Sequence, residues 1–64
     1  MSKEEKYETV ILNGHSVDYD ACVMAMDEDI REQVHRRLGV CTAQEFLDAY
    51  IIEHKAKFNE DFTI

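Results

Sequence analysis

The sequence predicts an α+β fold in which an N-terminal β-hairpin packs on two or three α-helices. Three observations lead to this prediction: an Asn-Gly pair between two β-prone runs, apolar residues at helical spacing, and a capping box that opens a second helical stripe. With 64 residues, the chain has room for one domain only. Residues 1–6 are charged and carry no periodicity, so we expect a disordered N-terminus followed by a single compact acidic domain over residues 7–64.

The hairpin is predicted from the pair Asn13-Gly14, because both positions of a two-residue turn need a positive φ. A loop of this length fixes the register of the strand pairs, which are Leu12 with His15, Val10 with Val17, and Glu8 with Tyr19. In this register the apolar side chains share the face that we expect to pack on the core: Val10, Leu12, Val17 and Tyr19. Two strands alone are marginal in water, so helices must cover that face.

The first helical segment spans residues 20–38, and its apolar stripe is Val23, Met26, Ile30, Val34 and Leu38. Asp20 and Asp27 are both candidate N-caps. The segment therefore forms either one helix or two helices broken near Met26-Asp27, and we favour the break. Gly39 ends it, behind two arginines that suit the negative end of a helix dipole.

The second helix begins at a capping box, Thr42-Ala43-Gln44-Glu45, flanked by Cys41 and Phe46 as a hydrophobic staple. A broad apolar stripe follows: Phe46, Leu47, Tyr50, Ile51, His54 and Phe58. Asn59 stands where a left-handed residue would stop the helix. Residues 61–64 alternate in polarity, which is compatible with a short third strand beside the hairpin.

The sequence offers no pattern for metal binding or catalysis. His15, His35 and His54 are 20 and 19 residues apart, which matches no structural zinc pattern, and neither cysteine has a partner at C-x2-C spacing. The aspartates lack the spacing of a calcium loop, and no nucleophile motif or glycine-rich loop accompanies them. We therefore expect a protein that is not an enzyme and that uses no metal and no cofactor.

The two cysteines, Cys22 and Cys41, are predicted to be free thiols of a reducing compartment, with one disulfide as the alternative. No apolar run reaches the roughly 18 residues that a membrane span needs, and the start of the chain lacks the apolar stretch of a signal peptide. With these features we expect a cytoplasmic monomer that contacts no membrane.

The charge of the chain is more informative. Fourteen carboxylates face seven Lys and Arg, giving a net charge of −7, which repels nucleic acid and attracts basic surfaces. Between residues 8 and 32 a single cation, Arg31, interrupts seven carboxylates. Most of the remaining cations lie later in the chain: Arg36, Arg37, Lys55 and Lys57. An acidic row that is not interleaved with cations favours a basic partner, although an ordinary solvated helix face explains these residues equally well.

Carboxylates four residues apart on a helix, such as Glu28 and Glu32, lie about 6 Å from each other, which is comparable to the spacing of phosphates along a nucleic-acid strand. A rigid helix with such a row can imitate DNA to a protein that has a basic cleft. The predicted partner-binding residues are Asp18, Asp20, Asp27, Glu28, Asp29, Glu32, Glu45 and Asp48.

Four segments carry a resemblance to known proteins: Tyr19-Asp20-Ala21 and residues 26–32, 41–50 and 54–62. They are similar to small acidic proteins of phages and other mobile elements, in particular to anti-CRISPR proteins that act on type I systems. The shared features are caps and apolar stripes, and Asn59 stands where glycine is expected. The resemblance implies a protein inhibitor that mimics DNA and blocks target binding by a Cascade-type complex, through a Cas subunit or another nucleic-acid-binding protein.

Two other functions remain open on these residues. An antitoxin or a phage regulatory adaptor would bind a protein through an exposed hydrophobic helix face. A DNA-binding regulator is the third hypothesis, and the negative charge opposes it because such domains carry a basic patch. Salt separates the first two functions, since charge-driven binding weakens at high ionic strength and apolar docking does not.

Overall fold

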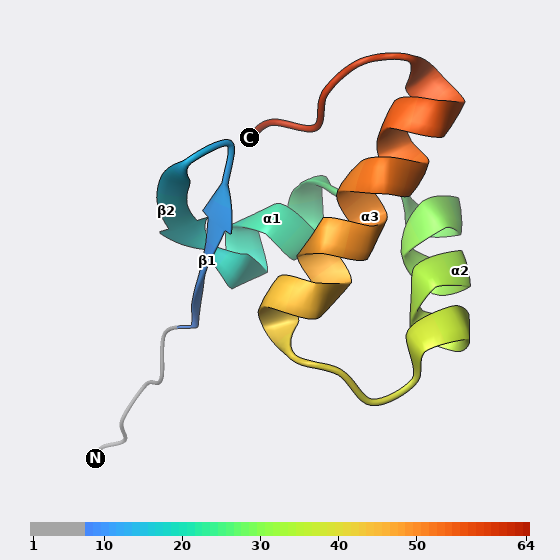
Figure 1. The fold of residues 1–64 in the computed structure, drawn as a ribbon, viewed down its shortest axis with the longest axis horizontal. Helices are drawn as coiled ribbons and strands as arrows, with labels where there is room; N and C mark the ends of the chain where they lie inside the picture. Colours follow the sequence, from blue (N-terminus) through green and yellow to red (C-terminus); the bar gives the residue numbers. More distant parts are fainter. Residues whose placement is uncertain (1–7) are drawn as a thin grey trace.

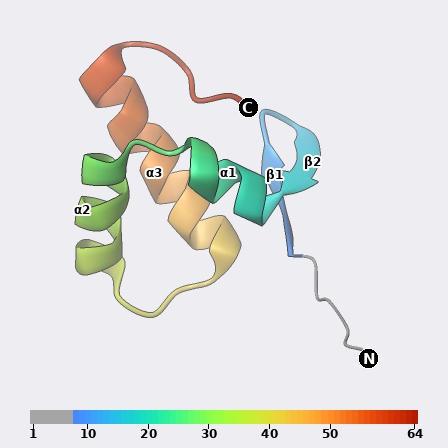
Figure 2. The same ribbon diagram turned by 180° about the vertical axis from the view of Figure 1, so that it is seen from behind.

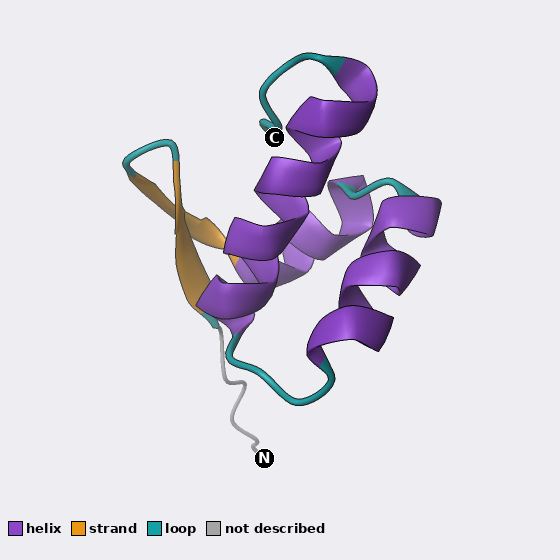
Figure 3. Ribbon diagram, turned by 45° about the vertical axis from the view of Figure 1, so that its right-hand side comes forward, coloured by secondary structure: helices purple, strands orange, loops and turns teal. Residues whose placement is uncertain are grey.

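The computed structural model describes residues 8–64, so the predicted disordered segment 1–6 lies outside the described residues. Its elements are β1 (Thr9–Leu12), β2 (His15–Asp18), α1 (Tyr19–Ala25), α2 (Glu28–Leu38) and α3 (Ala43–Phe58). The predicted α+β fold is thereby confirmed, with the hairpin at one end and the three helices packed beside it (Figure 1; Figure 3). None of the helices described is long and apolar enough to cross a membrane.

The hairpin has the predicted register. Asn13 and Gly14 adopt φ values of 54° and 82°, and the paired residues run from Leu12↔His15 to Thr9↔Asp18. The next predicted pair is also in place, since the Tyr19 N–H donates to the Glu8 carbonyl at 2.8 Å. Val10 and Leu12 are buried, as the register requires.

The predicted break between two helices is confirmed, because α1 ends at Ala25 and α2 begins at Glu28. Asp27 is the N-cap of α2 and accepts the Ile30 N–H at 3.2 Å. The assignment of Asp20 as the first cap is wrong: Asp18 caps α1 and accepts the Ala21 N–H at 3.3 Å. The physical reason is that β2 runs into α1 without a loop, so the last strand residue already has the extended backbone of a cap.

The signals at both ends of α3 are confirmed. Thr42 Oγ1 accepts the Glu45 N–H at 3.1 Å, and Glu45 Oε1 accepts the Thr42 N–H at 3.0 Å, which completes the capping box. Asn59 has the left-handed φ and ψ of 59° and 35°, and its N–H bonds to the Lys55 carbonyl. These local signals fix where the longest helix begins and ends.

The third strand expected over residues 61–64 is not formed, and the sheet among the described residues has two strands. The tail does return to the hairpin, as Figure 1 shows. Asn13 Nδ2 donates to the Phe62 carbonyl at 3.3 Å, and the Phe62 side chain is buried. The tail is therefore held by one buried aromatic side chain instead of a backbone ladder.

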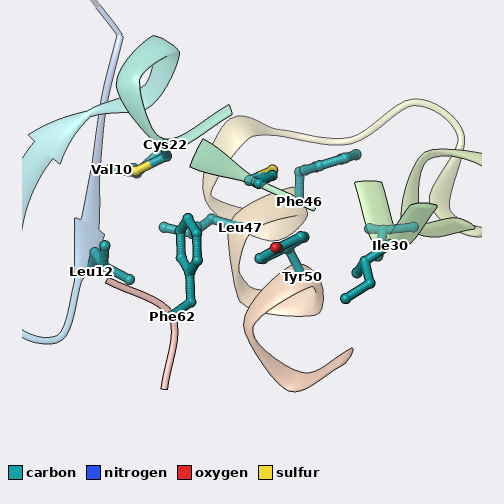
Figure 4. Packing of buried hydrophobic residues seen from close by; sticks show 10 residues of the cluster. Val10, Leu12, Cys22, Ile30, Phe46, Leu47, Tyr50 and Phe62 are labelled. Atoms are coloured by element: carbon teal, nitrogen blue, oxygen red, sulfur yellow. The ribbon is translucent and has the colours of Figure 1, made fainter. Parts of the chain in front are cut away.

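The core lies where α3 meets the hairpin on one side and α2 on the other. Leu47 and Tyr50 of α3 are fully buried at its centre, and Phe62 packs edge-to-face on Tyr50 with ring centroids 4.9 Å apart (Figure 4). From the back, α1 lies across α3 and contributes Cys22 to the same core (Figure 2). All three helices thus pack around one small core, and each begins at or beside a carboxylate.

Candidate partner-binding surface

The eight carboxylates predicted to bind a partner lie at the starts of the three helices. Asp18 and Asp20 stand at α1, Glu45 and Asp48 belong to the first turns of α3, and the others open α2: Asp27, Glu28, Asp29 and Glu32. Carboxylates are favoured there because the helix dipole is positive at its N-terminus. Part of the acidic pattern therefore has a structural cause, of which the sequence indicated the roles of Asp27 and Glu45 but not that of Asp18.

Four of the eight carboxylates are committed to the fold. Asp18 and Asp27 cap α1 and α2, Glu45 closes the capping box, and Asp48 accepts the Gln44 side-chain amide at 3.1 Å. Replacing a cap costs about 1 kcal/mol of stability, so Asp18, Asp27 and Glu45 have a reason to be acidic without any partner.

Asp27 has the most strongly perturbed environment of this group. Its pKa is lowered below the ordinary value of 3.8, first because the carboxylate accepts the Ile30 N–H and then because of the Lys57 ammonium, 3.3 Å away. Its backbone N–H donates to the Tyr50 hydroxyl at 2.7 Å, and that hydroxyl lies 3.0 Å from His54 Nδ1. The start of α2 is thus tied to α3 through both its backbone and its carboxylate.

The other four carboxylates are exposed: Asp20, Glu28, Asp29 and Glu32. Within residues 8–64 their carboxylates make no hydrogen bond and no ion pair. Glu28 and Glu32 lie one turn apart on α2. Glu32 lines two surface grooves, one that α2 forms with α1 and one that it forms with α3. These side chains are available to a partner.

Ion pairs neutralise charge along the C-terminal half of α3 and just after it. Besides the Lys57–Asp27 contact, Arg37 pairs with Glu53 at 3.2 Å and Lys55 pairs with Asp61 at 3.2 Å. Exposed pairs of this kind add little stability, but they cancel charge locally. The unpaired negative charge is therefore concentrated at the starts of α1 and α2.

A groove that the sequence did not predict lies between α1, the middle and C-terminal end of α2, and the segment that leads into α3. It has a volume of about 720 Å³, and we call it the Val40 groove. Its apolar lining comes from three segments: Tyr19, Val23, Val40, Cys41 and Phe46. Its polar lining belongs to α2: Arg31, Glu32 and His35. Sequence patterns miss such a groove because no single segment forms it, and the one signal is an apolar residue directly after Gly39.

The described residues hold no cluster of three His, Cys, Asp or Glu side chains that would suit a metal ion. Cys22 is buried and Cys41 is partly exposed in the Val40 groove, and both are free thiols. His54 and His35 make different contacts. His54 shares a hydrogen bond with the Tyr50 hydroxyl, whereas the His35 ring centroid lies 6.5 Å from that of Phe46.

The comparison with protein families gives one match. A family model described as "Anti-CRISPR protein AcrIC5" matches residues 10–62, which is more than half of the chain. The match spans the hairpin and the three helices, and it contains all eight carboxylates. No curated protein matches the chain.

Proposed function

The chain belongs to the AcrIC5 family of anti-CRISPR proteins, and we propose that it inhibits a type I-C CRISPR surveillance complex by presenting a DNA-like row of carboxylates to a basic, DNA-binding surface of a Cas subunit. In this proposal the inhibitor works in the host cytoplasm by occupation, without catalysis and without binding nucleic acid itself. In this proposal the contacts are made by the exposed carboxylates that have no partner among the described residues: Asp20, Glu28, Asp29 and Glu32.

The observation that carries this proposal is the unpaired state of Glu28 and Glu32 among the described residues. Like charges four residues apart on a helix are destabilising by about 0.2–0.5 kcal/mol, which offsets much of what Glu28 gains from the helix dipole, and Glu32, beyond the first turn, has no such gain. On a basic partner each carboxylate faces a cation, so attraction to the partner outweighs the repulsion between the two carboxylates.

The support beneath these residues favours the same function. The Asp27 cap, the Lys57 contact and the Tyr50 hydroxyl hold the first turn of α2 in place before any partner arrives. A preorganised row of charges loses little conformational entropy on binding, which raises affinity. Rigidity of this kind is what a mimic of a stiff duplex needs.

The alternative, docking through a hydrophobic helix face, has less support. Each of α1 and α2 carries one exposed large apolar residue, Met24 and Leu38, and those of α3, Ile52 and Phe58, are six positions apart. In the part of the chain that is described, no helix therefore shows exposed large apolar residues at i, i+3 or i, i+4 spacing, which such docking requires.

Competition with DNA tests the proposal. The purified, guide-loaded type I-C complex is titrated with the inhibitor in the presence of labelled target duplex, at low and at moderate salt. We expect the inhibitor to displace the duplex, and its own affinity to fall steeply as salt rises. A ternary complex of inhibitor, surveillance complex and duplex, or an affinity that salt does not change, would refute mimicry.

A further inference from the structure

Val40 occupies an unusual position for an apolar residue. It lies between α2 and α3, directly after Gly39, whose φ of 66° turns the chain out of α2. Its side chain is fully exposed, although it is β-branched and apolar, and it lines the Val40 groove. The folded chain alone gains nothing from this exposure.

The groove has the character of a binding site for an apolar group. A volume of about 720 Å³ falls within the roughly 300–1,000 Å³ of ordinary ligand pockets, and its lining is mainly apolar with a few polar side chains. Val23 and Cys41 pack against the core from beneath, so the floor is fixed while Val40 stands at the rim.

Charge identifies the occupant. Glu32 of α2 lines the groove, and Asp20 lies one turn before the lining residue Val23 on α1, so each of these helices brings a carboxylate to the region of the groove. Arg31 is the one cation in the lining. A second copy of the chain would bring another net charge of −7 to this rim and be repelled.

We propose that the Val40 groove receives an apolar side chain that projects from among Lys and Arg residues on the target's basic surface. This inference rests on the proposed function and deepens it: the carboxylates attract and orient the target, and the groove anchors it. Binding then has a salt-sensitive part and a salt-resistant part, as expected where one buried side chain supplies much of the affinity.

Replacing the apolar side chain of Val40 by a charged one distinguishes an apolar anchor from binding by charge alone. Val40→Glu adds a carboxylate to a groove that Glu32 also lines, so a purely electrostatic inhibitor should bind the type I-C complex as tightly as before or more tightly. With an apolar anchor, we expect about tenfold weaker binding at both low and moderate salt. Val40→Thr has the same shape without the charge, and several-fold weaker binding is expected.

The matched control is Ile52→Glu, which makes the same chemical change on α3 outside the groove, at a residue that is 66% exposed. We expect it to bind like the wild type. Circular dichroism should show unchanged melting for the Val40 variants, because that side chain is exposed. The anchor is refuted if Val40→Glu binds as tightly as Ile52→Glu, or if the wild type forms a dimer that Val40→Glu dissociates.

A double variant on α2 distinguishes the apolar anchor from the proposed function. If Glu28→Gln with Glu32→Gln lowers affinity while Val40→Glu does not, mimicry stands and the anchor is wrong. If the Glu pair has no effect on affinity or on its salt dependence, the proposed function is wrong, and the anchor as stated here falls with it.

Discussion

The side-chain amide of Gln44 pairs with both backbone polar groups of Ile11. Gln44 Oε1 accepts the Ile11 N–H at 2.8 Å, and Gln44 Nε2 donates to the Ile11 carbonyl at 3.1 Å. Ile11 is opposite Ser16, one residue from each of the hydrogen-bonded pairs of the ladder, so its polar groups point away from β2. One side chain of α3 thus occupies the place that a neighbouring strand would take on β1, and it protects that edge.

Gln44→Ala should remove this edge contact. We expect the free energy of unfolding to fall by about 1 kcal/mol and the melting temperature by about 4–8 °C, because two backbone groups lose their partners. Thermal denaturation followed by circular dichroism measures the effect. Asp48→Asn is the control, since an amide oxygen can still accept from Gln44 and the Ile11 contact is kept. Equal melting of Gln44→Ala and wild type would contradict the prediction.

The sequence predicted those features whose causes are local. The turn at Asn13-Gly14, the capping box at Thr42 and the stop at Asn59 each depend on a few adjacent residues, and all are confirmed. The predicted third strand was wrong because the side chain of Gln44 occupies the free edge of β1 at Ile11. These two residues are 33 positions apart in the sequence. No local pattern reports a contact of that range.

The candidate site likewise has features that the sequence predicted and features that depend on contacts between distant residues. Its acidity was evident from composition, but which carboxylates cap helices depends on where the helices begin. Asp27 has a further role that needs Lys57, 30 positions away, and the Val40 groove needs three segments together. The sequence therefore predicted the sign of the surface, and the fold determines which charges remain available.

Asp27 should make stability depend on acid pH. Its pKa in the folded protein is below 3.8, so the folded state holds the proton less tightly than the unfolded state does. The stabilisation is therefore complete above about pH 5 and is lost as pH falls through the folded-state pKa. We expect Asp27→Asn, which retains a capping oxygen, to make the free energy of unfolding fall less as the pH is lowered. Urea unfolding measured across this range decides: parallel curves for variant and wild type would exclude a role for the charge.

The two thiols should differ in reactivity. Burial, followed by the nearby Asp18 carboxylate, raises the pKa of the Cys22 thiol, whereas Cys41 is partly exposed in the Val40 groove. Iodoacetamide should therefore modify Cys41 first and Cys22 only on unfolding. Mass spectrometry of digests over time measures both sites, and similar rates would contradict the prediction. Reductant should leave the melting temperature unchanged, since both thiols are free.

The position of the carboxylates should matter more than the total charge. Glu28→Gln with Glu32→Gln removes two charges from the proposed contact row, and Glu60→Gln with Asp61→Asn removes two from the region after α3. We expect the first pair to weaken binding to the type I-C complex about tenfold at low salt and less at high salt. The second pair should bind nearly as the wild type does, because its one ion pair, with Lys55, is exposed.

Melting curves keep this test separate from folding. The variant with both Glu28→Gln and Glu32→Gln should melt close to the wild-type temperature, since relief of the like-charge contact offsets the lost interaction of Glu28 with the helix dipole. Glu45→Ala should do the reverse: it opens the capping box and lowers stability by about 1 kcal/mol, while molecules that remain folded bind normally. If both charge-removing pairs weaken binding equally, net charge alone drives the interaction. The row on α2 would then be an ordinary solvated helix face, and the mimicry that we propose would lose its structural basis.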